Sequence, residues 1–169
     1  FPCQSFSIVA QNPKRLGVKD ERGKLFFEMC RILRERQPKC FIAENVKGIL
    51  TANKRSAFPL ILKEFEESGY EVQYQILNSA DYGVPQKRER VIIIGFRKDL
   101  NITFSFPEAE IDDETKYIPL KTVIEKRVDE KYFFSERAVA GMMKKRESMN
   151  KGRAQNINKP CNTVGAHLA

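Results

Sequence analysis

The sequence has 169 residues, which is enough for one domain with a buried core, or for one domain and the start of a second. Hydrophobic residues make up 41% of the chain and charged residues 31%, a composition that is ordinary for a globular protein and does not indicate disorder. Thirty Lys and Arg against 22 Asp and Glu give a net charge of +8, which is compatible with a polyanionic partner but does not by itself require one.

A helix and a strand are predicted in the first quarter of the chain. Residues 1–22 have no sustained periodicity, which is typical of an extended loop. Apolar residues at helical spacing predict a helix over residues 24–36. The apolar run 40–43 predicts a buried strand that stops at Glu44 and Asn45.

The next part of the chain predicts a second helix and two strands. The helix covers residues 57–68, with Ser56 as its N-cap and Gly69 at its end. Residues 70–77 alternate between apolar and polar, which predicts a strand, and 91–94 form the most β-branched run of the chain.

This order of elements predicts an α/β fold with a mostly parallel sheet. The last two strands are joined by a segment too short for a helical crossover, so we expect them to pair antiparallel. Beyond these strands the pattern weakens. It predicts a short helix over 118–126, a basic helix over 135–149 capped by Ser135, and irregular structure over 150–169.

The cysteines give no sign of a metal site. Cys3, Cys30, Cys40 and Cys161 form no Cys-x-x-Cys pair, and the chain has one histidine. We therefore expect no metal. Because no long apolar run or signal-peptide pattern occurs, we also expect no membrane partner and a cytoplasmic location.

The first segment that could carry chemistry is Phe-Pro-Cys-Gln at residues 1–4. A cysteine in a loop of small polar residues could be an exposed nucleophile. The alternative is a buried apolar thiol, the usual fate of a free cysteine. The tetrapeptide alone favours that alternative for Cys3.

The second segment is Glu44-Asn45-Val46, directly after the strand predicted over 40–43. Open α/β sheets place their functional sites at the carboxyl ends of strands. A partly desolvated carboxylate at this edge could hold or give a proton near neutral pH. The alternative is a capping or loop carboxylate without a chemical role.

The third segment is Gln-Lys-Arg-Glu-Arg at residues 86–90, which leads into the strand predicted over 91–94. In a strand, Arg88 and Arg90 would point to the same face. Two guanidinium groups on one face suit a phosphate or a base carbonyl. The alternative is a solvated, salt-bridged edge, which the intervening Glu89 favours.

In this order, the three segments resemble DNA cytosine-5 methyltransferases, above all the bacterial modification enzymes. The segments at 1–7, 43–48 and 81–90 resemble that family's fourth, sixth and eighth conserved motifs. Three motifs in register are a specific signal. The resemblance is close over 1–97 and loose over 98–169, where the family has its variable target recognition region.

The resemblance implies part of a Rossmann-like S-adenosylmethionine-dependent methyltransferase domain, with a mostly parallel sheet and an antiparallel last strand. Residues 1–105 would be the second part of the catalytic domain, and 106–169 a linker and the start of the recognition region. The implied cofactor is S-adenosyl-L-methionine, and the implied partner is double-stranded DNA in a restriction-modification system.

The resemblance also assigns the catalytic residues. Cys3 would add as a thiolate to carbon 6 of a flipped cytosine, which activates carbon 5 for methylation. Glu44 would bind the ring at N3, and Arg90 would bind its O2. Arg88 would complete this catalytic set by binding a backbone phosphate.

Further contacts follow from the same resemblance. Asn45 would brace the nucleophile loop, and Pro2 would contact the cofactor. The carbonyl of Phe1 would bind the exocyclic amine of the cytosine. The residues expected to bind DNA are Phe1, Gln4, Ser7, Gln86 and Arg88.

In this family, a glycine-rich cofactor loop and an acidic ribose-binding strand precede the cysteine motif, and helical motifs follow the recognition region. Neither set is found in the sequence between Phe1 and Ala169. We expect an excerpt of a longer enzyme in preference to one subunit of a split methyltransferase. A complementing amino-terminal segment or subunit is therefore an expected partner.

Two other functions stay open. One is a non-catalytic DNA-binding module, against which the intact set of Cys3, Glu44, Arg88 and Arg90 argues. The other is a tRNA cytosine methyltransferase of the same fold, which Ser7 and the Gln-x-Arg-x-Arg pattern disfavour.

Overall fold

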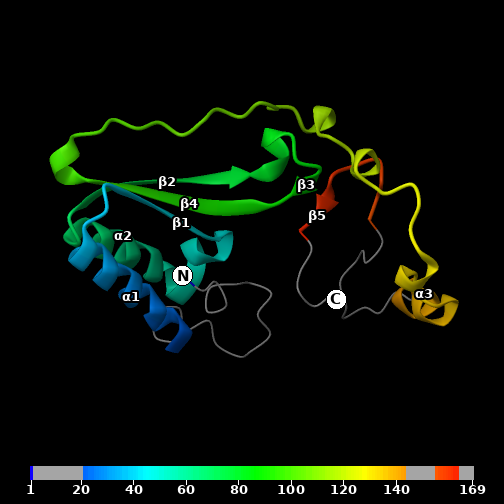
Figure 1. Cartoon of the computed structure of the whole chain (residues 1–169), viewed down its shortest axis with the longest axis horizontal. Coiled ribbons are helices and arrows are strands. Elements are labelled where there is room, and N and C mark those ends of the chain that lie inside the picture. Colours follow the sequence, from blue (N-terminus) through cyan, green and yellow to red (C-terminus); the bar gives the residue numbers. More distant parts are fainter. Residues whose placement is uncertain (2–20, 144–154, 164–169) are drawn as a thin grey trace. The chain divides into compact units, whose positions relative to one another are not determined.

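The computed structural model describes residues 1, 21–143 and 155–163 (Figure 1). Contacts divide the chain into two compact units, each described here by itself. The first unit consists of Phe1–Asn78 and Glu89–Glu108, and the second of Ser79–Arg88 and Ala109–Ala169. The assignment of 1–105 to a catalytic domain and of 106–169 to a recognition region stays a prediction.

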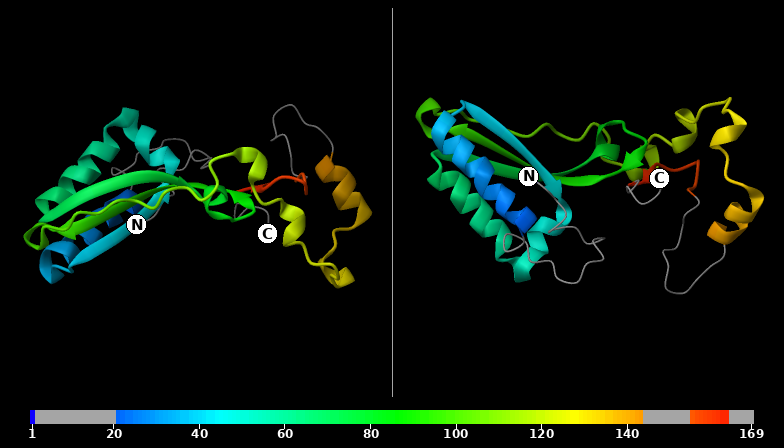
Figure 2. Two further views of the ribbon diagram at one scale, coloured as in Figure 1. Left: turned by 90° about the horizontal axis from the view of Figure 1, so that it is seen from above. Right: turned by 60° about the horizontal axis from the view of Figure 1, so that its bottom comes forward.

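The first unit is a three-stranded sheet with two helices on one of its faces (Figures 1 and 2). Its strands are β1 (Cys40–Val46), β2 (Tyr70–Asn78) and β4 (Glu89–Arg97), and its helices are α1 (Glu21–Arg36) and α2 (Ala57–Glu67). A 3-10 segment, η2 (Lys47–Arg55), connects β1 to α2. The strand order is β1-β4-β2, and β4 is antiparallel to both neighbours.

The strand and helix predictions in this unit are largely confirmed. The two helices, the two early strands and the antiparallel pairing of the last two strands are all present. β1 and β2 run in the same direction, but β4 lies between them. The sequence does not predict this strand order.

Two local predictions are wrong. β1 does not stop at Glu44 and Asn45 but continues to Val46, because β4 pairs with it as far as the Val46–Arg90 position. Ser56 does not cap α2 with its side chain. Its hydroxyl donates instead to the carbonyl oxygen of Asn53, at 2.7 Å.

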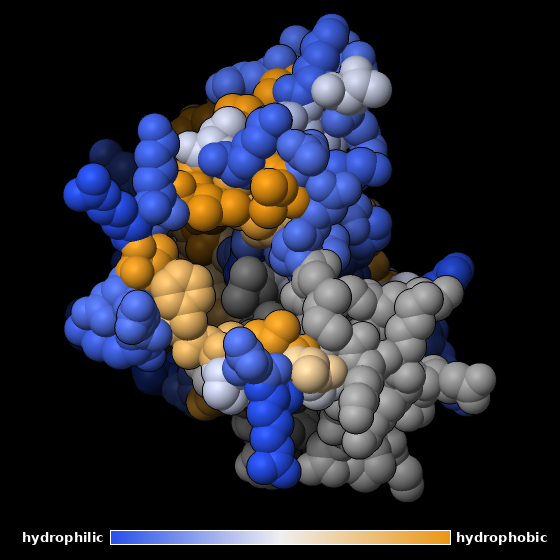
Figure 3. Space-filling model, turned by 90° about the vertical axis from the view of Figure 1, so that its right-hand side faces the viewer, coloured by the Kyte–Doolittle hydropathy of each residue, from blue (hydrophilic) through white to orange (hydrophobic). Residues whose placement is uncertain are grey.

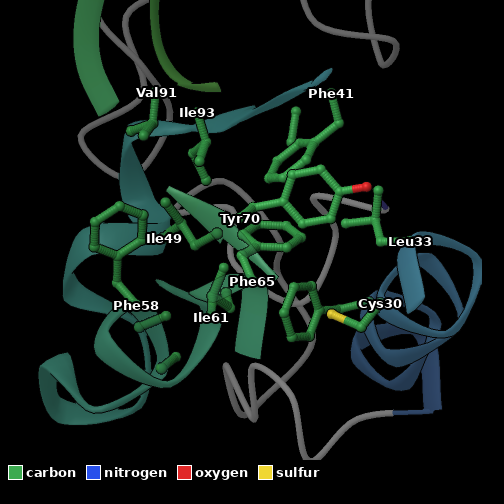
Figure 4. Close-up of a cluster of buried hydrophobic side chains, with 14 residues drawn as sticks. Cys30, Leu33, Phe41, Ile49, Phe58, Ile61, Phe65, Tyr70, Val91 and Ile93 are labelled. Carbon is green, nitrogen blue, oxygen red and sulfur yellow. The ribbon is translucent and has the colours of Figure 1, made fainter. Parts of the chain in front are cut away.

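The core lies between the sheet and the two helices. α1 buries Phe26, Cys30 and Leu33, which recur at helical spacing on one face. Phe65 of α2 packs against Phe41 of β1, and the ring of Tyr70 on β2 also meets Phe41 (Figure 4). The face of the sheet that carries Phe41 is therefore the one that the helices cover.

Burial also decides the state of Cys30. Its side chain is fully buried, and loss of solvation raises the pKa of the thiol to about 11. The Cys30 thiol is therefore neutral at neutral pH. Because only the thiolate form is reactive, Cys30 is an unreactive core residue.

Gly95 of β4 gives a test of this packing. It lies opposite Phe41 on β1, and an added Cβ would come closer than 3.0 Å to atoms of that ring. We expect Gly95→Ala to lower the free energy of unfolding by about 1–3 kcal/mol through overpacking. Urea titration measures the loss.

Gly141 of α3 (Glu136–Met143) is the matched control, because an added Cβ there meets nothing within 4 Å. Gly141→Ala should leave stability unchanged or raise it by up to about 1 kcal/mol. Equal losses of stability in both variants would show that the contact with Phe41 does not restrict the size of the side chain at position 95.

The second unit contains a short parallel pair of strands, β3 (Gln86–Lys87) and β5 (Cys161–Asn162). The capping of α3 is confirmed, since the Ser135 hydroxyl oxygen accepts from the amide of Ala138 at 3.3 Å. The rest of the helix predicted over 135–149 lies outside the described residues, as do most of residues 150–169. The strand at Cys161 was not predicted.

The helix predicted over 118–126 is wrong. This segment forms only a single 3-10 turn, Leu120–Thr122, which begins after Pro119 in an extended conformation. The Thr122 hydroxyl donates to the Pro119 carbonyl, at 2.8 Å, and so closes the turn locally. Such side-chain bonds compete with helix formation.

Large apolar side chains are exposed near this turn and after it. They are Val123, Ile124, Val128, Tyr132, Phe133 and Phe134. Figure 3 shows apolar residues lying exposed among hydrophilic ones on one side of the molecule. Exposed apolar patches are typical of surfaces that contact another segment or partner.

Neither a membrane span nor a metal cluster is found in the described part of the chain. None of its helices combines the length and apolar character needed to cross a bilayer. Among the same residues, no group of three or more His, Cys, Asp or Glu side chains is placed to hold a metal ion.

Candidate active site

The pairing of β1 with β4 brings Glu44 and Arg90 together. Glu44 lies opposite Ile92, two residues from Arg90, so both charged side chains project from the same face of the sheet. The Arg90 Nε lies 2.7 Å from the Glu44 Oε1. Two of the three segments found in the sequence therefore meet in one ion pair.

This ion pair leaves polar atoms available. Arg90 also donates from Nη1 to the main-chain oxygen of Glu89 at 2.7 Å, so among the described residues Nη2 has no acceptor. The Glu44 side chain is 49% exposed and that of Arg90 17% exposed. Glu44 is thus half exposed among the described residues, and its partial desolvation stays a prediction. A carboxylate and a guanidinium side by side can contact neighbouring atoms of one planar ring.

A second ion pair, which the sequence motifs do not predict, adjoins the first. Lys47, directly after β1, lies with its Nζ 2.7 Å from the Glu89 Oε1. Both side chains are half exposed, so the pair contributes at most about 1 kcal/mol to stability. Its position matters more, since Glu89 is the residue whose carbonyl holds Arg90. The signal in the sequence was a Lys three residues after Glu44 and a Glu next to Arg90.

Asn45 connects β1 to the start of the chain. It is fully buried, its Nδ2 donates to the Phe1 carbonyl at 3.4 Å, and its Oδ1 accepts from the Val46 amide at 3.0 Å. The Phe1 ring packs edge-on against Phe26, with centroids 5.2 Å apart. The residue two positions before Cys3 is thus held by a buried amide and an aromatic contact.

We expect Asn45→Ala to destabilise the fold. The change removes the acceptor of the Val46 amide and the donor to the Phe1 carbonyl, and unsatisfied buried polar groups cost about 1–3 kcal/mol. Urea unfolding measures the loss. Gln75→Ala is the control, because Gln75 is an exposed polar residue of the same sheet. Equal stability of the two variants would contradict a bracing role for Asn45.

Gln86 and Arg88 belong to the second unit. Arg88 lies between β3 and β4 and not in a strand, so the prediction that it shares a strand face with Arg90 is wrong. The Gln86 Nε2 donates to the Cys161 Sγ at 3.6 Å, and its carbonyl accepts from the Ser79 hydroxyl at 2.7 Å. The main chain of residues 86–88 is therefore held within the second unit.

Lys87 and Tyr117 hold this segment against residues 109–118. The Lys87 Nζ is paired with Glu114 and lies 5.4 Å from the centroid of the Tyr117 ring. The Tyr117 hydroxyl donates to the carboxylate of Asp81. The Gln-Lys-Arg segment thus takes its conformation from residues far along the chain, as well as from its own strand.

Four predicted site residues lie outside the described residues: Pro2, Cys3, Gln4 and Ser7. Of the cysteines that are described, Cys30 and Cys161 are buried and Cys40 is exposed at the first position of β1. Cys40 is thus at the opposite end of β1 from the Glu44–Arg90 pair.

Comparison with known proteins identifies the family of this chain. A family model described as C-5 cytosine-specific DNA methylase matches residues 1–165. The chain belongs to that family. The chain is 52% identical over 118 residues to the Type II methyltransferase M.FnuDI of Fusobacterium nucleatum. The alignment covers 69% of this chain and 33% of that protein. It is 39% identical over 146 residues to the Type II methyltransferase M.BsuFI of Bacillus subtilis, covering 80% and 34%.

Solved structures agree on the fold. The S. pombe Dnmt2 methyltransferase superposes with a TM-score of 0.60 at 17% identity, covering 94% of this chain and 47% of that one. The predicted α/β methyltransferase fold is thereby confirmed. The chain spans about a third of the length of the C-5 methylase relatives that it matches.

Proposed function

We propose that the protein transfers a methyl group from S-adenosyl-L-methionine to carbon 5 of a flipped cytosine in double-stranded DNA, in the cytoplasm, as part of a restriction-modification system. The observation that carries this proposal is the Glu44–Arg90 ion pair, which lies within a family match that spans residues 1–165. The names of the relatives, Type II methyltransferases, support the restriction-modification role.

The reaction begins with a nucleophile, for which Cys3 is proposed. Its thiolate adds to carbon 6 of the cytosine, and the ring electrons move to carbon 5, which becomes nucleophilic. Carbon 5 then forms a bond to the donor's methyl group as the donor's sulfur–methyl bond breaks. Loss of the carbon 5 proton to a base or solvent expels the thiolate from carbon 6 and restores the ring.

Glu44 and Arg90 would act on the ring during this addition. Negative charge develops on the ring as the thiolate adds, and a hydrogen bond or proton at N3 from Glu44 relieves it. Arg90, held by Glu44 and by the Glu89 carbonyl, directs its remaining nitrogen Nη2 to the O2. Because both partners are fixed before the substrate arrives, little reorganisation accompanies the reaction.

The other roles complete the proposal. Asn45 would brace the loop that carries Cys3 through its bond to the Phe1 carbonyl, and that carbonyl would face the exocyclic amine. Arg88 would bind a backbone phosphate, and the remaining DNA contacts would come from Gln4, Ser7 and Gln86. Residues 106–169 would begin the target recognition region.

Pro2, which is proposed to contact the methyl donor, lies outside the described residues, and the polar groups of the Glu44–Arg90 pair suit the cytosine. A complementing amino-terminal segment or subunit is therefore proposed to supply most of the donor site.

Transfer of tritium from labelled S-adenosylmethionine tests the function. We expect the full-length protein to label unmethylated duplex DNA, with the label in 5-methylcytosine. Fully methylated duplex of the same sequence and unmodified tRNA are the controls and should stay unlabelled. Label in tRNA alone would favour a tRNA methyltransferase, and no label in either would favour a non-catalytic DNA-binding module.

A further inference from the structure

The last three residues of η2, just before α2, form a turn with an unusual backbone. Asn53, Lys54 and Arg55 have φ values of 49°, 54° and 69°, all in the left-handed region. Residues other than glycine rarely adopt this region, and three in succession are strained. Strain of this kind is concentrated at functional sites, where the surrounding structure maintains it.

Local contacts keep the turn in this conformation. The Ser56 amide and hydroxyl both donate to the Asn53 carbonyl, at 3.1 and 2.7 Å, and the Asn53 Nδ2 donates to the Ser56 Oγ at 2.9 Å. Ala52 and Ala57 on either side are fully buried in the core. The turn is thus anchored at both ends, while Lys54 and Arg55 are exposed.

The charges of this turn are not neutralised. In the described part of the chain, neither Lys54 nor Arg55 has an acidic partner. Several other basic side chains of the first unit do have one, in the pairs Arg31–Glu28, Arg34–Glu64, Lys47–Glu89 and Lys63–Glu67, whereas among the same described residues Arg36 and Lys39 do not. Two adjacent unpaired cations on a rigid turn suit a polyanion better than a protein carboxylate network.

The turn lies at the end of the sheet that carries the candidate active site. Phe65, near the end of α2, packs against Phe41 at the beginning of β1. Phe58, in its first turn, packs against Tyr74, further along β2. α2 therefore runs back along the sheet, and the residues just before it lie towards the end where Glu44 pairs with Arg90.

We propose that Lys54 and Arg55 form a phosphate-binding turn for the DNA on which the Glu44–Arg90 site acts. This inference rests on the proposed function, because it takes the same duplex as its ligand. The Lys ammonium offers a compact charge and the Arg guanidinium a two-pronged donor, a combination that can contact adjacent backbone phosphates. The strained turn keeps both side chains directed outward before DNA binds.

Salt-dependent DNA binding tests the proposal. The double variant Lys54→Gln/Arg55→Gln of the full-length protein is compared with the unmodified protein, by fluorescence anisotropy on a labelled duplex across a series of KCl concentrations. Removing one phosphate contact reduces the magnitude of the slope of log affinity against log salt by about 0.9, so we expect a decrease of about 1.8. An unchanged slope would overturn the proposal.

Two controls distinguish a specific contact from loss of charge or of folding. Arg36→Gln/Lys39→Gln removes two exposed cations at the opposite end of β1, and its slope should stay that of the unmodified protein. An equal decrease in both double variants would also overturn the proposal. The charge-conserving variant Lys54→Arg/Arg55→Lys should restore the slope, and its failure to do so with normal thermal melting would count against phosphate binding.

Methyl transfer by the unmodified protein separates this inference from the proposed function. If the unmodified protein methylates DNA and the double variant keeps the full salt slope, only the phosphate-binding turn is rejected. If the unmodified protein transfers no methyl group, the proposed function is rejected on its own readout. A reduced slope in the double variant would still establish a DNA contact at Lys54 and Arg55.

Discussion

We expect a protein with Cys3 replaced by serine to transfer no measurable methyl group to DNA and to form no covalent adduct with duplex DNA that contains 5-fluorocytosine. The serine hydroxyl is a far weaker nucleophile than a thiolate, and loss of a catalytic nucleophile costs roughly 10³-fold or more in rate. In the unmodified protein, fluorine at carbon 5 should block the final elimination, so the proposed carbon 6 to sulfur bond should persist. Denaturing gel electrophoresis of labelled DNA, with methyl donor present, detects the adduct.

The matched control for this prediction is Cys40→Ser. Cys40 is an exposed free thiol at the other end of β1 from the Glu44–Arg90 pair, so its loss should change neither the adduct nor methyl transfer. An adduct that survives Cys3→Ser, or one that disappears in Cys40→Ser, would remove Cys3 from the proposed role of nucleophile.

Glu44→Gln is expected to lower the rate of methyl transfer by about 10²–10⁴-fold, the usual contribution of a general acid or base. Glutamine keeps the shape of glutamate and still offers Arg90 an acceptor oxygen, so the fold and DNA binding should change little. What the variant loses is the carboxyl group that is proposed to give a proton to N3. Single-turnover rates and the dissociation constant for DNA, measured on the same preparation, separate the two effects.

Glu89→Gln is the control for Glu44→Gln. Glu89 is also half exposed and also forms an ion pair of 2.7 Å, but with Lys47, and its contact with Arg90 is through the main chain. Its loss should therefore lower the rate by less than about tenfold, in line with the small energy of an exposed pair. Similar losses in the two variants, or a loss confined to DNA affinity, would contradict an acid role for Glu44.

The helices could be predicted because their signals are local. In α1, Phe26, Cys30 and Leu33 recur at helical spacing, and all three are buried against the sheet. The two wrong predictions about helices also have local causes. The hydroxyl of Thr122 bonds back to Pro119 and closes a single turn where a helix was predicted. That of Ser56 bonds to the Asn53 carbonyl and does not cap the helix.

The candidate site could be predicted only as a set of residues. Glu44 and Arg90 were singled out because each belongs to a family-like motif, but their contact depends on a strand register that links positions 46 residues apart. The exposure of Glu44 was not predicted, because exposure depends on everything packed around a side chain. Lys47 and Glu89 were missed for the same reason, since nothing in either segment shows that they face each other.

Three properties followed from the amino-acid sequence alone: the family, the helices and main strands of the first unit, and the residue types from which a cytosine site can be built. These properties depend on the spacing of residues along the chain and on motifs of adjacent residues, and both can be read directly from the sequence. Three further features appear only in the folded chain: β4 lies between β1 and β2, Glu44 pairs with Arg90, and Asn45 binds the Phe1 carbonyl. The strained turn that exposes Lys54 and Arg55 is a fourth. Each of these depends on contacts between distant residues, whose geometry is set by packing of the whole unit and not by any one segment.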